Sequence, residues 1–275
     1  MNHRHLLFFV FIGSAGAVLG LASTASTIAS AQTAPAPTAS PDARAQAIAD
    51  VVAANRILAD QNVVDGYGHV SVRDPTDPSK FLLARSMAPE LVTAADVLVH
   101  DLDGNTPASN AKLYAERFIH AEIYRTRPDV HAIVHCHSPS LIPFGVTGIA
   151  LRPLYHMSAF LGAGVPVFDI RKAAGGATDM LVRTPVLGRA LAQTLGAHPV
   201  ALMRGHGAVI VGRDIQQVVF RSVYTELNAH LQGQALALGA KVIYLDLEEA
   251  KKAEEGIDAT LGRPWELWLR KVKDR

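Results

Sequence analysis

The chain has 275 residues, of which 49% are hydrophobic, so it can bury a sizeable core without needing disulfides or a metal merely to fold. Its 26 lysines and arginines almost balance its 25 aspartates and glutamates, which gives a formal net charge of +1. This balance argues against a nucleic-acid-binding surface, which normally carries a basic excess. The composition is also neither acidic nor repetitive enough for a disordered protein.

The first 31 residues have the pattern of a secretory signal peptide. A weakly basic start precedes the apolar run LLFFVFIGSAGAVLGLA at 6–22, and Ala29 and Ala31 fit the A-x-A rule for cleavage after Ala31. Cleavage would leave Gln32 at the mature N-terminus of a periplasmic or secreted protein that does not bind the membrane. An uncleaved anchor is the alternative, because the apolar run approaches the length that spans a bilayer. Its Gly and Ser interruptions favour cleavage.

Residues 32–40, rich in Pro, Ala and Thr, are predicted to form a flexible linker, and residues 41–275 are predicted to form one domain. A first helix is expected to begin with Ser40 as its N-cap and Pro41 at its first position. The later predicted elements are strands at 69–73 and 80–85, a helix at 112–127, strands at 130–137, 199–204 and 208–212, and a helix at 214–238. The strand at 69–73 alternates like a half-buried one.

Two histidines lie one residue apart in AIVHCHSPS at 132–140. Because a strand turns alternate residues to the same face, His135 and His137 are expected to project together, roughly 7 Å apart at Cα. Two neutral imidazoles at that spacing can share a metal ion. A hydrogen-bonded surface pair at a strand end is the alternative. The single cysteine, Cys136, can form no intrachain disulfide and points to the opposite face with Val134, which favours buried packing over metal ligation.

Two other stretches carry groups that could join such a site. Glu116 lies four positions before His120, on the same face of the predicted helix, although this spacing is also common on solvated helices. His206 lies between two glycines after an apolar strand. Glycines allow the unusual backbone angles and close approach that present an imidazole into a cleft. A structural turn histidine is the alternative for His206.

Taken together, these stretches resemble the class II aldolase/adducin family. GHVSVR resembles the early strand motif of that family, AERFIHAEIYRTRPDVHAIVHCHSPS its central block, and LMRGHGAVIVG its third-ligand motif. The resemblance covers about residues 47–238. It implies an α/β fold, a single three-layer α/β/α sandwich with a central mixed, mainly antiparallel sheet. Related enzymes are tetramers with active sites at subunit boundaries, so a homo-oligomer is expected.

The resemblance also implies a metal site. His135, His137 and His206 would bind one divalent metal ion, zinc in the first place, with Mn, Mg, Fe or Co as alternatives. Glu116 would act as the acid/base and as a fourth ligand. Adducin-like members are non-catalytic interaction proteins that lack the metal histidines, so the presence of all three favours an enzyme. A non-haem iron oxygenase is disfavoured, because its jelly-roll fold needs many short strands rather than long helices.

The sequence departs from the sugar-phosphate members of the family. His69 replaces the usual asparagine of GNxS, Tyr114 and Ala115 replace paired serines, and ARSM at 84–87 replaces a TPTG-like turn. A methionine in place of a glycine amide makes an ordinary phosphate cradle doubtful. Arg85 instead offers a planar fork for a carboxylate, with a surface salt bridge as its alternative role.

These departures, with HSPSLIPFGVTG and LRPLYHMSAFLG, resemble the decarboxylase-like branch of the family, whose members act on hydroxy-carboxy-muconic semialdehyde or dihydroxyphthalate-type acids. The branch implies a carbon–carbon lyase that decarboxylates a 2-hydroxy or 2-oxo acid through a metal-stabilised enolate. Retro-aldol cleavage of a hydroxy-carbonyl or sugar-phosphate substrate is the alternative. Glu116 would supply the proton. The candidate contacts of the small carboxylic acid substrate are His69, Arg85, Ser86 and His156, with a buried packing role as the alternative for His156.

Overall fold

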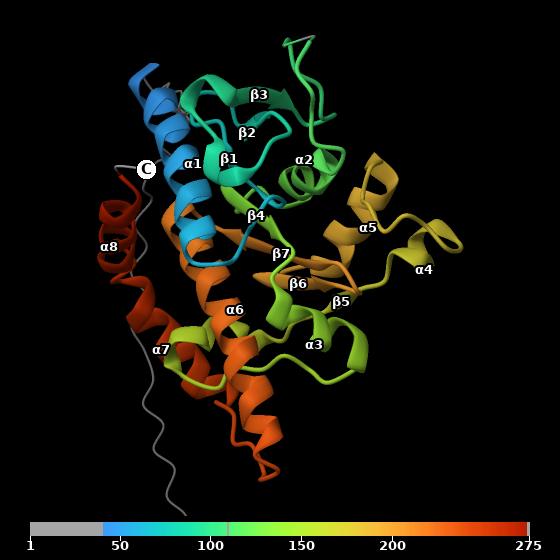
Figure 1. The fold of residues 1–275 in the computed structure, drawn as a ribbon, viewed down its shortest axis with the longest axis vertical. Coiled ribbons are helices and arrows are strands. Elements are labelled where there is room, and N and C mark those ends of the chain that lie inside the picture. The colour runs from blue at the N-terminus through green and yellow to red at the C-terminus, as the bar shows by residue number, and fades with distance from the viewer. Residues whose placement is uncertain (1–40, 109, 274–275) are drawn as a thin grey trace, which may run out of the picture. The chain divides into compact units, whose positions relative to one another are not determined.

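The computed structural model describes residues 41–108 and 110–273. The strands are β1 (His69–Arg73), β2 (Lys80–Ala84), β3 (Val97–Asp101), β4 (Ala132–Cys136), β5 (Val167–Phe168), β6 (Val200–Met203) and β7 (Gly207–Gly212). They form one sheet in the order β3-β2-β1-β4-β7-β6-β5 (Figure 1). Neighbouring strands are antiparallel except β5 and β6, which are parallel. The predicted mixed, mainly antiparallel sheet is therefore confirmed.

The α-helices are α1 (Pro41–Asp60), α2 (Arg117–Thr126), α3 (Ile142–Thr147), α4 (Ile170–Ala174), α5 (Pro185–Leu195), α6 (Ile215–Ala237), α7 (Leu247–Asp258) and α8 (Gly262–Val272). Short 3-10 helices, η1 to η4, lie at Pro89–Leu91, Ala94–Asp96, Pro139–Leu141 and His156–Ala163. Helix α1 begins at Pro41 as predicted, whereas its predicted N-cap, Ser40, lies outside the described residues. The predicted signal peptide and linker, residues 1–40, also lie outside them.

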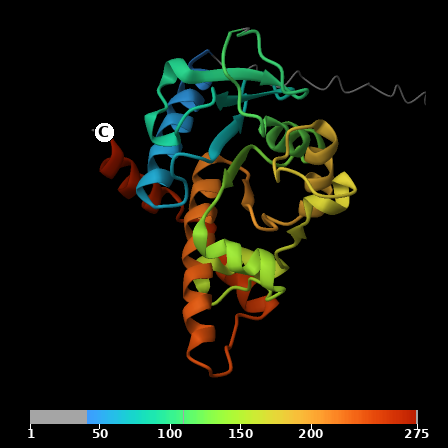
Figure 2. The ribbon, with the colours of Figure 1, turned by 45° about the vertical axis from the view of Figure 1, so that its right-hand side comes forward.

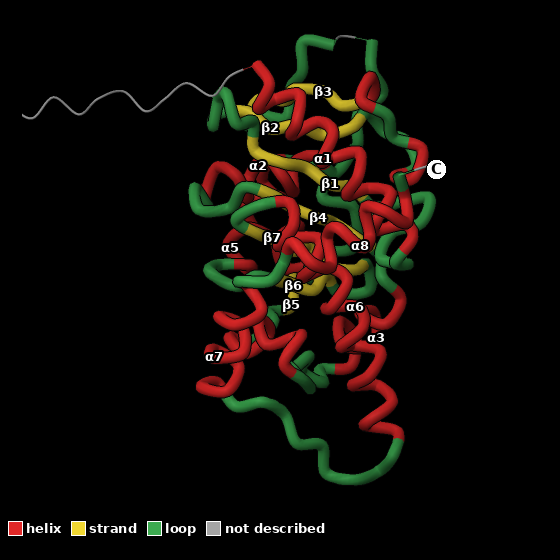
Figure 3. The backbone as a smooth tube through the Cα atoms, turned by 90° about the vertical axis from the view of Figure 1, so that its left-hand side faces the viewer, coloured by secondary structure: helices red, strands yellow, loops and turns green. Residues whose placement is uncertain are grey.

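Helices cover both faces of the sheet, which gives the three expected layers. Helices α1, α6 and α8 share one apolar cluster with the sheet, and α2 and α5 share the other. Successive residues of β4 divide between the two clusters, since Ala132 and Val134 lie in the first and Ile133 in the second. Figure 2 shows α2 beside α5, and Figure 3 shows the strands stacked from β3 to β5 behind α1, α6 and α8.

Two predictions about strands were wrong, and the first was wrong because helices cover both faces of the sheet. The strand at 69–73 was expected to be half-buried, yet all five residues of β1 are buried. The strand predicted over 130–137 ends at Cys136, so His137 follows the strand instead of closing it. Cys136 is fully buried among apolar side chains, as predicted.

The helix predicted over 112–127 is also shorter than expected. Helix α2 begins at Arg117, and Glu116 is its N-cap residue rather than a residue of its first turn. The preceding residues are held outside the helix by tertiary contacts, because Tyr114 donates its hydroxyl proton to the carbonyl of Met87 at 2.5 Å. Glu116 therefore stands at the junction of a loop and a helix, where its side chain can turn toward the sheet.

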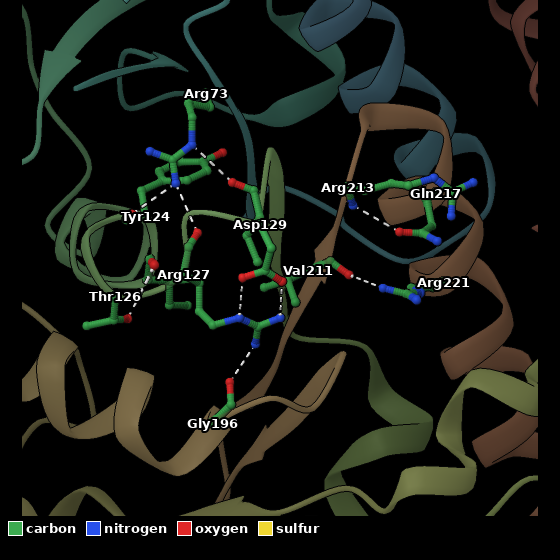
Figure 4. A network of polar contacts seen from close by, with 12 residues as sticks. Arg73, Tyr124, Thr126, Arg127, Asp129, Gly196, Val211, Arg213, Gln217 and Arg221 are labelled. Carbon is green, nitrogen blue, oxygen red and sulfur yellow. Dashed lines mark hydrogen bonds and ion pairs between the residues drawn. The ribbon is translucent and has the colours of Figure 1, made fainter. Parts of the chain in front are cut away.

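A polar network ties the end of β1 to α2 (Figure 4). The guanidinium of Arg73 donates to the backbone carbonyls of Tyr124 and Arg127 at 2.9 and 3.0 Å. Arg127 in turn pairs with Asp129 at 2.7 Å and donates to the carbonyl of Gly196. Charged donors on backbone acceptors form strong hydrogen bonds, so this network fixes the position of α2 against the sheet.

Among the described residues, no helix combines the length and apolarity that crossing a membrane requires. The two tryptophans near the chain end, Trp265 and Trp268, are buried against the cluster formed with α1 and α6. They therefore dock α8 onto their own chain.

Trp268→Ala should lower the free energy of unfolding by about 3–5 kcal/mol, because it empties a buried aromatic site. Leu267→Ala is the matched control, since Leu267 is 55% exposed on the same helix and should change stability by less than about 0.5 kcal/mol. Urea unfolding measures the stability of both variants. Far-ultraviolet circular dichroism is the signal, because it reports the helices and does not depend on tryptophan fluorescence. Equal losses in the two variants would show that α8 does not contribute to the core.

Candidate metal centre

Three neighbouring parts of the fold bring Glu116, His135, His137 and His206 together. His135 lies in β4 and His137 directly after it, while His206 lies in the turn between β6 and β7. Strand β4 pairs with β7, which in turn pairs with β6, so the end of β4 lies beside this turn. Glu116 reaches the same place from the N-terminus of α2. One ligand atom from each of the four residues lies within 4.8 Å of all the others.

The three imidazoles meet through their Nε2 atoms. His137 Nε2 lies 3.1 Å from His135 Nε2 and 3.0 Å from His206 Nε2. Glu116 Oε2 lies 3.4 Å from the Nε2 of His135 and 3.5 Å from that of His206. All four groups of the predicted ligand set are therefore adjacent in space.

Backbone carbonyls fix two of these rings in one tautomer. His135 Nδ1 lies 3.0 Å from the carbonyl oxygen of Ala208, and His206 Nδ1 lies 2.9 Å from that of Met180. A carbonyl only accepts hydrogen bonds, so each Nδ1 must carry the proton and donate it. In a neutral ring the Nε2 atom is then a bare lone pair, which is the state that binds a metal.

This arrangement fits a divalent metal ion. Lone pairs of imidazole nitrogens repel one another at about 3 Å unless a cation or a proton lies between them. Three imidazoles and one carboxylate form a donor set that suits zinc, whose nitrogen and oxygen ligands lie at about 2.0–2.2 Å. The described residues thus include a Glu/His3 cluster that could hold a metal ion.

Glycines permit the close approach of the His206 turn to β4. A Cβ added to Gly207 would lie 2.0 Å from the carbonyl oxygen of Cys136, which no real side chain tolerates. Gly205 has φ +63°, a left-handed conformation that glycine adopts without strain. The two glycines that flank His206 in the sequence therefore have the role that their pattern predicts.

The carboxylate is buried and held in one orientation. Glu116 Oε1 accepts the backbone N–H of Val182 at 2.9 Å, which leaves Oε2 facing the histidines. Burial raises the pKa of Glu116, but the charges and hydrogen bonds of His135 and His206 outweigh it and hold the pKa far below its ordinary value. Conversely, burial lowers the pKa of His206, yet Glu116 more than compensates and raises it above the ordinary value.

His137 behaves differently from its two partners. Burial, together with the charges of His135 and His206, lowers the pKa of His137 to about 4. A site with three adjacent imidazoles cannot accept three protons, because their positive charges repel one another. His137 is therefore neutral at physiological pH and available as a ligand.

The candidate substrate contacts lie at varying distances from this cluster. His69 stands opposite His135 in the pairing of β1 with β4, and the two ring centroids lie 5.0 Å apart. Arg85 forms an ion pair with Asp96 at 2.7 Å, and 45% of its side chain is exposed. This contact is the surface salt bridge that was the alternative role for Arg85. A substrate carboxylate would have to compete with Asp96 for that guanidinium.

Two other candidates lie in loops or short helices. Ser86 follows Arg85 and donates its backbone N–H to the carbonyl of Lys112 at 2.7 Å. His156 begins η4 and is exposed, and its described ring contact is with Tyr155 rather than with the cluster. The roles of Arg85, Ser86 and His156 toward a substrate stay predictions.

The sequence patterns did not predict the buried polar group beside His69. His120, expected to share a face with Glu116, is fully buried and its ring nitrogens lie near His69 and Ser71 instead of the metal ligands. Two periodicities could have indicated this: His69 and Ser71 alternate along β1, and His120 and Tyr124 lie four residues apart on α2.

Comparison with known proteins identifies the family of the chain. Residues 49–232 match the family model described as the Class II Aldolase and Adducin N-terminal domain. The chain is 38% identical over 241 residues to the decarboxylase tropJ of Talaromyces stipitatus, covering 79% of this chain and 90% of that protein. It is 32% identical over 234 residues to the 3,4-dihydroxyphthalate decarboxylase of Arthrobacter keyseri, covering 78% of this chain and 88% of that protein.

Solved structures share the fold at lower identity. L-fuculose 1-phosphate aldolase from Glaciozyma antarctica superposes with a TM-score of 0.71 and 22% identity, covering 88% of this chain and 94% of that one. An aldolase II superfamily protein from Pseudomonas syringae gives 0.70 and 23%, covering 86% and 95%. These likenesses establish the architecture, while the family match and the decarboxylase relatives establish the kind of protein. The chain belongs to the class II aldolase and adducin family and is an enzyme of its aldolase and decarboxylase type.

Proposed function

We propose that this enzyme is a metal-dependent decarboxylase that acts on a small 2-hydroxy or 2-oxo carboxylic acid. The observation that carries the proposal is the convergence of three imidazole nitrogens and one carboxylate oxygen within 4.8 Å. The relatives named decarboxylases support loss of carbon dioxide as the reaction. Zinc is the first candidate for the ion, because the ligand set is rich in imidazole.

His135, His137 and His206 would hold the ion, with Glu116 at its side. A divalent ion, when bound, supplies Lewis-acid stabilisation of the negative charge that develops on a substrate oxygen as the carbon–carbon bond breaks. The carbonyls of Ala208 and Met180 orient His135 and His206 in the tautomer whose Nε2 faces the site. The rings therefore need no rearrangement when substrate arrives.

Glu116 would manage the proton. His135 and His206 stabilise its ionised form in the resting site, so Oε2 has a lone pair that can accept a proton from a substrate hydroxyl, whose acidity a bound divalent ion would increase. When carbon dioxide leaves, the electron pair of the broken bond remains on the substrate carbon, and Glu116 returns its proton there. The N–H of Val182 holds Oε1 throughout, which leaves one oxygen free for this transfer.

Retro-aldol cleavage is the second candidate, since it uses the same metal-stabilised carbanion and the structural neighbours include L-fuculose 1-phosphate aldolases. A screen that offers 2-hydroxy, 2-oxo and dihydroxy-aromatic acids beside sugar phosphates distinguishes the two. We expect carbon dioxide release from an acid by the metal-loaded enzyme and no aldehyde from the phosphates. Aldehyde release without carbon dioxide would establish the aldolase instead.

We further propose that the protein is exported with Gln32 as its mature N-terminus and forms a homo-oligomer. Export rests on the predicted signal peptide, and oligomerisation rests on the family resemblance. Mass spectrometry of the periplasmic protein should give a chain that begins at Gln32. Sedimentation equilibrium should give a mass above that of one chain.

Each of the variants His135→Ala, His137→Ala and His206→Ala should lose most of the bound metal. The variant site keeps only two imidazoles and one carboxylate, so it has lost one of its four ligands. His230→Ala is the matched control, since His230 is exposed on α6 and should leave the metal content unchanged. Plasma mass spectrometry of the purified variants gives the metal-to-protein ratio. Full metal content in all three variants would exclude this cluster as the site.

Glu116→Gln should retain most of the metal but lose about 10²- to 10⁴-fold in kcat, because an amide keeps the shape of the side chain and cannot exchange a proton. Metal content and the rate of carbon dioxide release are measured on the same preparation. An active Glu116→Gln variant would assign the proton transfer to another group.

A further inference from the structure

Four buried side chains form a continuous hydrogen-bonded chain beside the candidate metal centre. His69 Nδ1 lies 2.6 Å from His120 Nε2, and His120 Nδ1 lies 2.6 Å from Ser71 Oγ. Ser71 Oγ lies 2.8 Å from the hydroxyl of Tyr124. The members come alternately from β1 and α2, and each is at most 4% exposed. We call this group the His69 relay.

The far end of the relay is fixed in position. The guanidinium of Arg73 lies 4.7 Å from the ring centroid of Tyr124 and donates to the backbone carbonyl of the same residue (Figure 4). Such a cation over an aromatic face, with a charged hydrogen bond to the backbone, restrains the ring. The hydroxyl of Tyr124 therefore has a defined direction, toward Ser71.

Both histidines of the relay carry a single proton. His69 and His120 are 4% and 0% exposed, and among the described residues neither ring has a carboxylate partner, so a positive charge on either would be buried without a counter-ion. Each neutral ring has one N–H donor and one bare nitrogen. The relay can therefore run in one of two directions, and its direction decides which nitrogen of His69 holds the proton.

Tyr124 selects the direction. Among the described residues its hydroxyl has Ser71 as its one hydrogen-bond partner. If Ser71 donated to Tyr124, the phenolic proton would be buried without an acceptor, which folded proteins avoid. Tyr124 must therefore donate to Ser71, Ser71 to His120 Nδ1, and His120 Nε2–H to His69 Nδ1. His69 is left with its proton on Nε2.

The Nε2–H of His69 is free for a ligand. It has no hydrogen-bond partner within the described chain, and the two nitrogens of an imidazole point in widely different directions, so it faces away from His120. The ring packs 5.0 Å from that of His135 and 4.5 Å from that of Tyr114. His69 thus holds a neutral donor at the edge of the metal centre.

We propose that His69 is a catalytic residue that donates its Nε2–H to the substrate oxygen on which negative charge develops, and that His120, Ser71 and Tyr124 are positioning residues that fix this tautomer. The proposal rests on the proposed decarboxylation for the identity of that oxygen. A preorganised donor in a buried site stabilises developing charge without any proton transfer. The opposite tautomer would present a base, which repels the same oxygen.

The tautomer can be read without any assay of activity. Long-range proton–nitrogen correlation spectra of the zinc-loaded, ¹⁵N-histidine-labelled enzyme distinguish protonated from bare ring nitrogens, and His69→Gln assigns the signals. We expect His69 and His120 both to be protonated at Nε2 and bare at Nδ1. Protonation of His69 at Nδ1 would overturn the proposal. A failure of the decarboxylase assay would leave this spectrum unchanged, so the two proposals fail separately.

Variants of His69 test the donor itself. Glutamine places an amide N–H near the position of Nε2, whereas asparagine reaches only the position of Nδ1. His69→Gln should keep kcat within about tenfold of wild type, and His69→Asn should lose about 10²- to 10³-fold with unchanged KM and metal content. Equal loss in both variants would overturn a donor role at Nε2.

Ser71 tests the relay. Ser71→Ala removes the link that transmits the direction, so His69 should populate both tautomers and kcat should fall in proportion to the fraction protonated at Nε2. Thr126→Val is the matched control, because Thr126 lies on the same helix and donates its hydroxyl proton to the backbone carbonyl of Glu122, outside the relay, so the His69 tautomer and kcat should not change. A fall in kcat without any change in the His69 tautomer would reduce Ser71 to a structural role.

Discussion

The antiparallel pairing of β4 with β7 is the constraint on which the site depends. It places the end of β4, with His135 and His137, against the turn that carries His206. The approach is so close that only glycine fits at position 207, where a Cβ would lie 2.0 Å from the carbonyl of Cys136. The spacing of these three candidate ligands is thus set by the backbone of the sheet. Such ligands sit on rigid elements, which preserves their spacing.

A sheet covered on both faces makes polar side chains costly unless each is paired. His135 and His206 each donate Nδ1–H to a backbone carbonyl. The polar groups of the His69 relay are hydrogen-bonded to one another. Helix α2 contributes to both arrangements, because Glu116 precedes it and His120 and Tyr124 lie within it. The position of this one helix therefore couples the metal centre to the relay. Arg73, which binds the carbonyls at the end of α2, maintains that coupling.

Substrate recognition is the part of the site that the fold constrains least. The loop with Arg85 lies outside the strands, and its guanidinium is engaged by Asp96. His69 occupies a strand position directly opposite His135, so its distance from the metal ligands is set by strand pairing. Residues on paired strands keep fixed distances, whereas loop residues can exchange partners when a ligand binds.

The sequence alone predicted which four groups meet in the Glu/His3 cluster. The pattern of two histidines one residue apart predicted that His135 and His137 project together, although His137 lies just after the strand. The glycines around His206 indicated a close turn, and the order of motifs indicated the family and its mixed sheet. Tertiary structure decided what local patterns cannot encode. The hydrogen bond from Tyr114 to Met87 holds the preceding residues outside the helix, so α2 begins at Arg117. Helices on both faces of the sheet bury β1 completely. The direction of the His69 relay depends on atoms from two elements about fifty residues apart, whose hydrogen bonds exist only once the chain has folded.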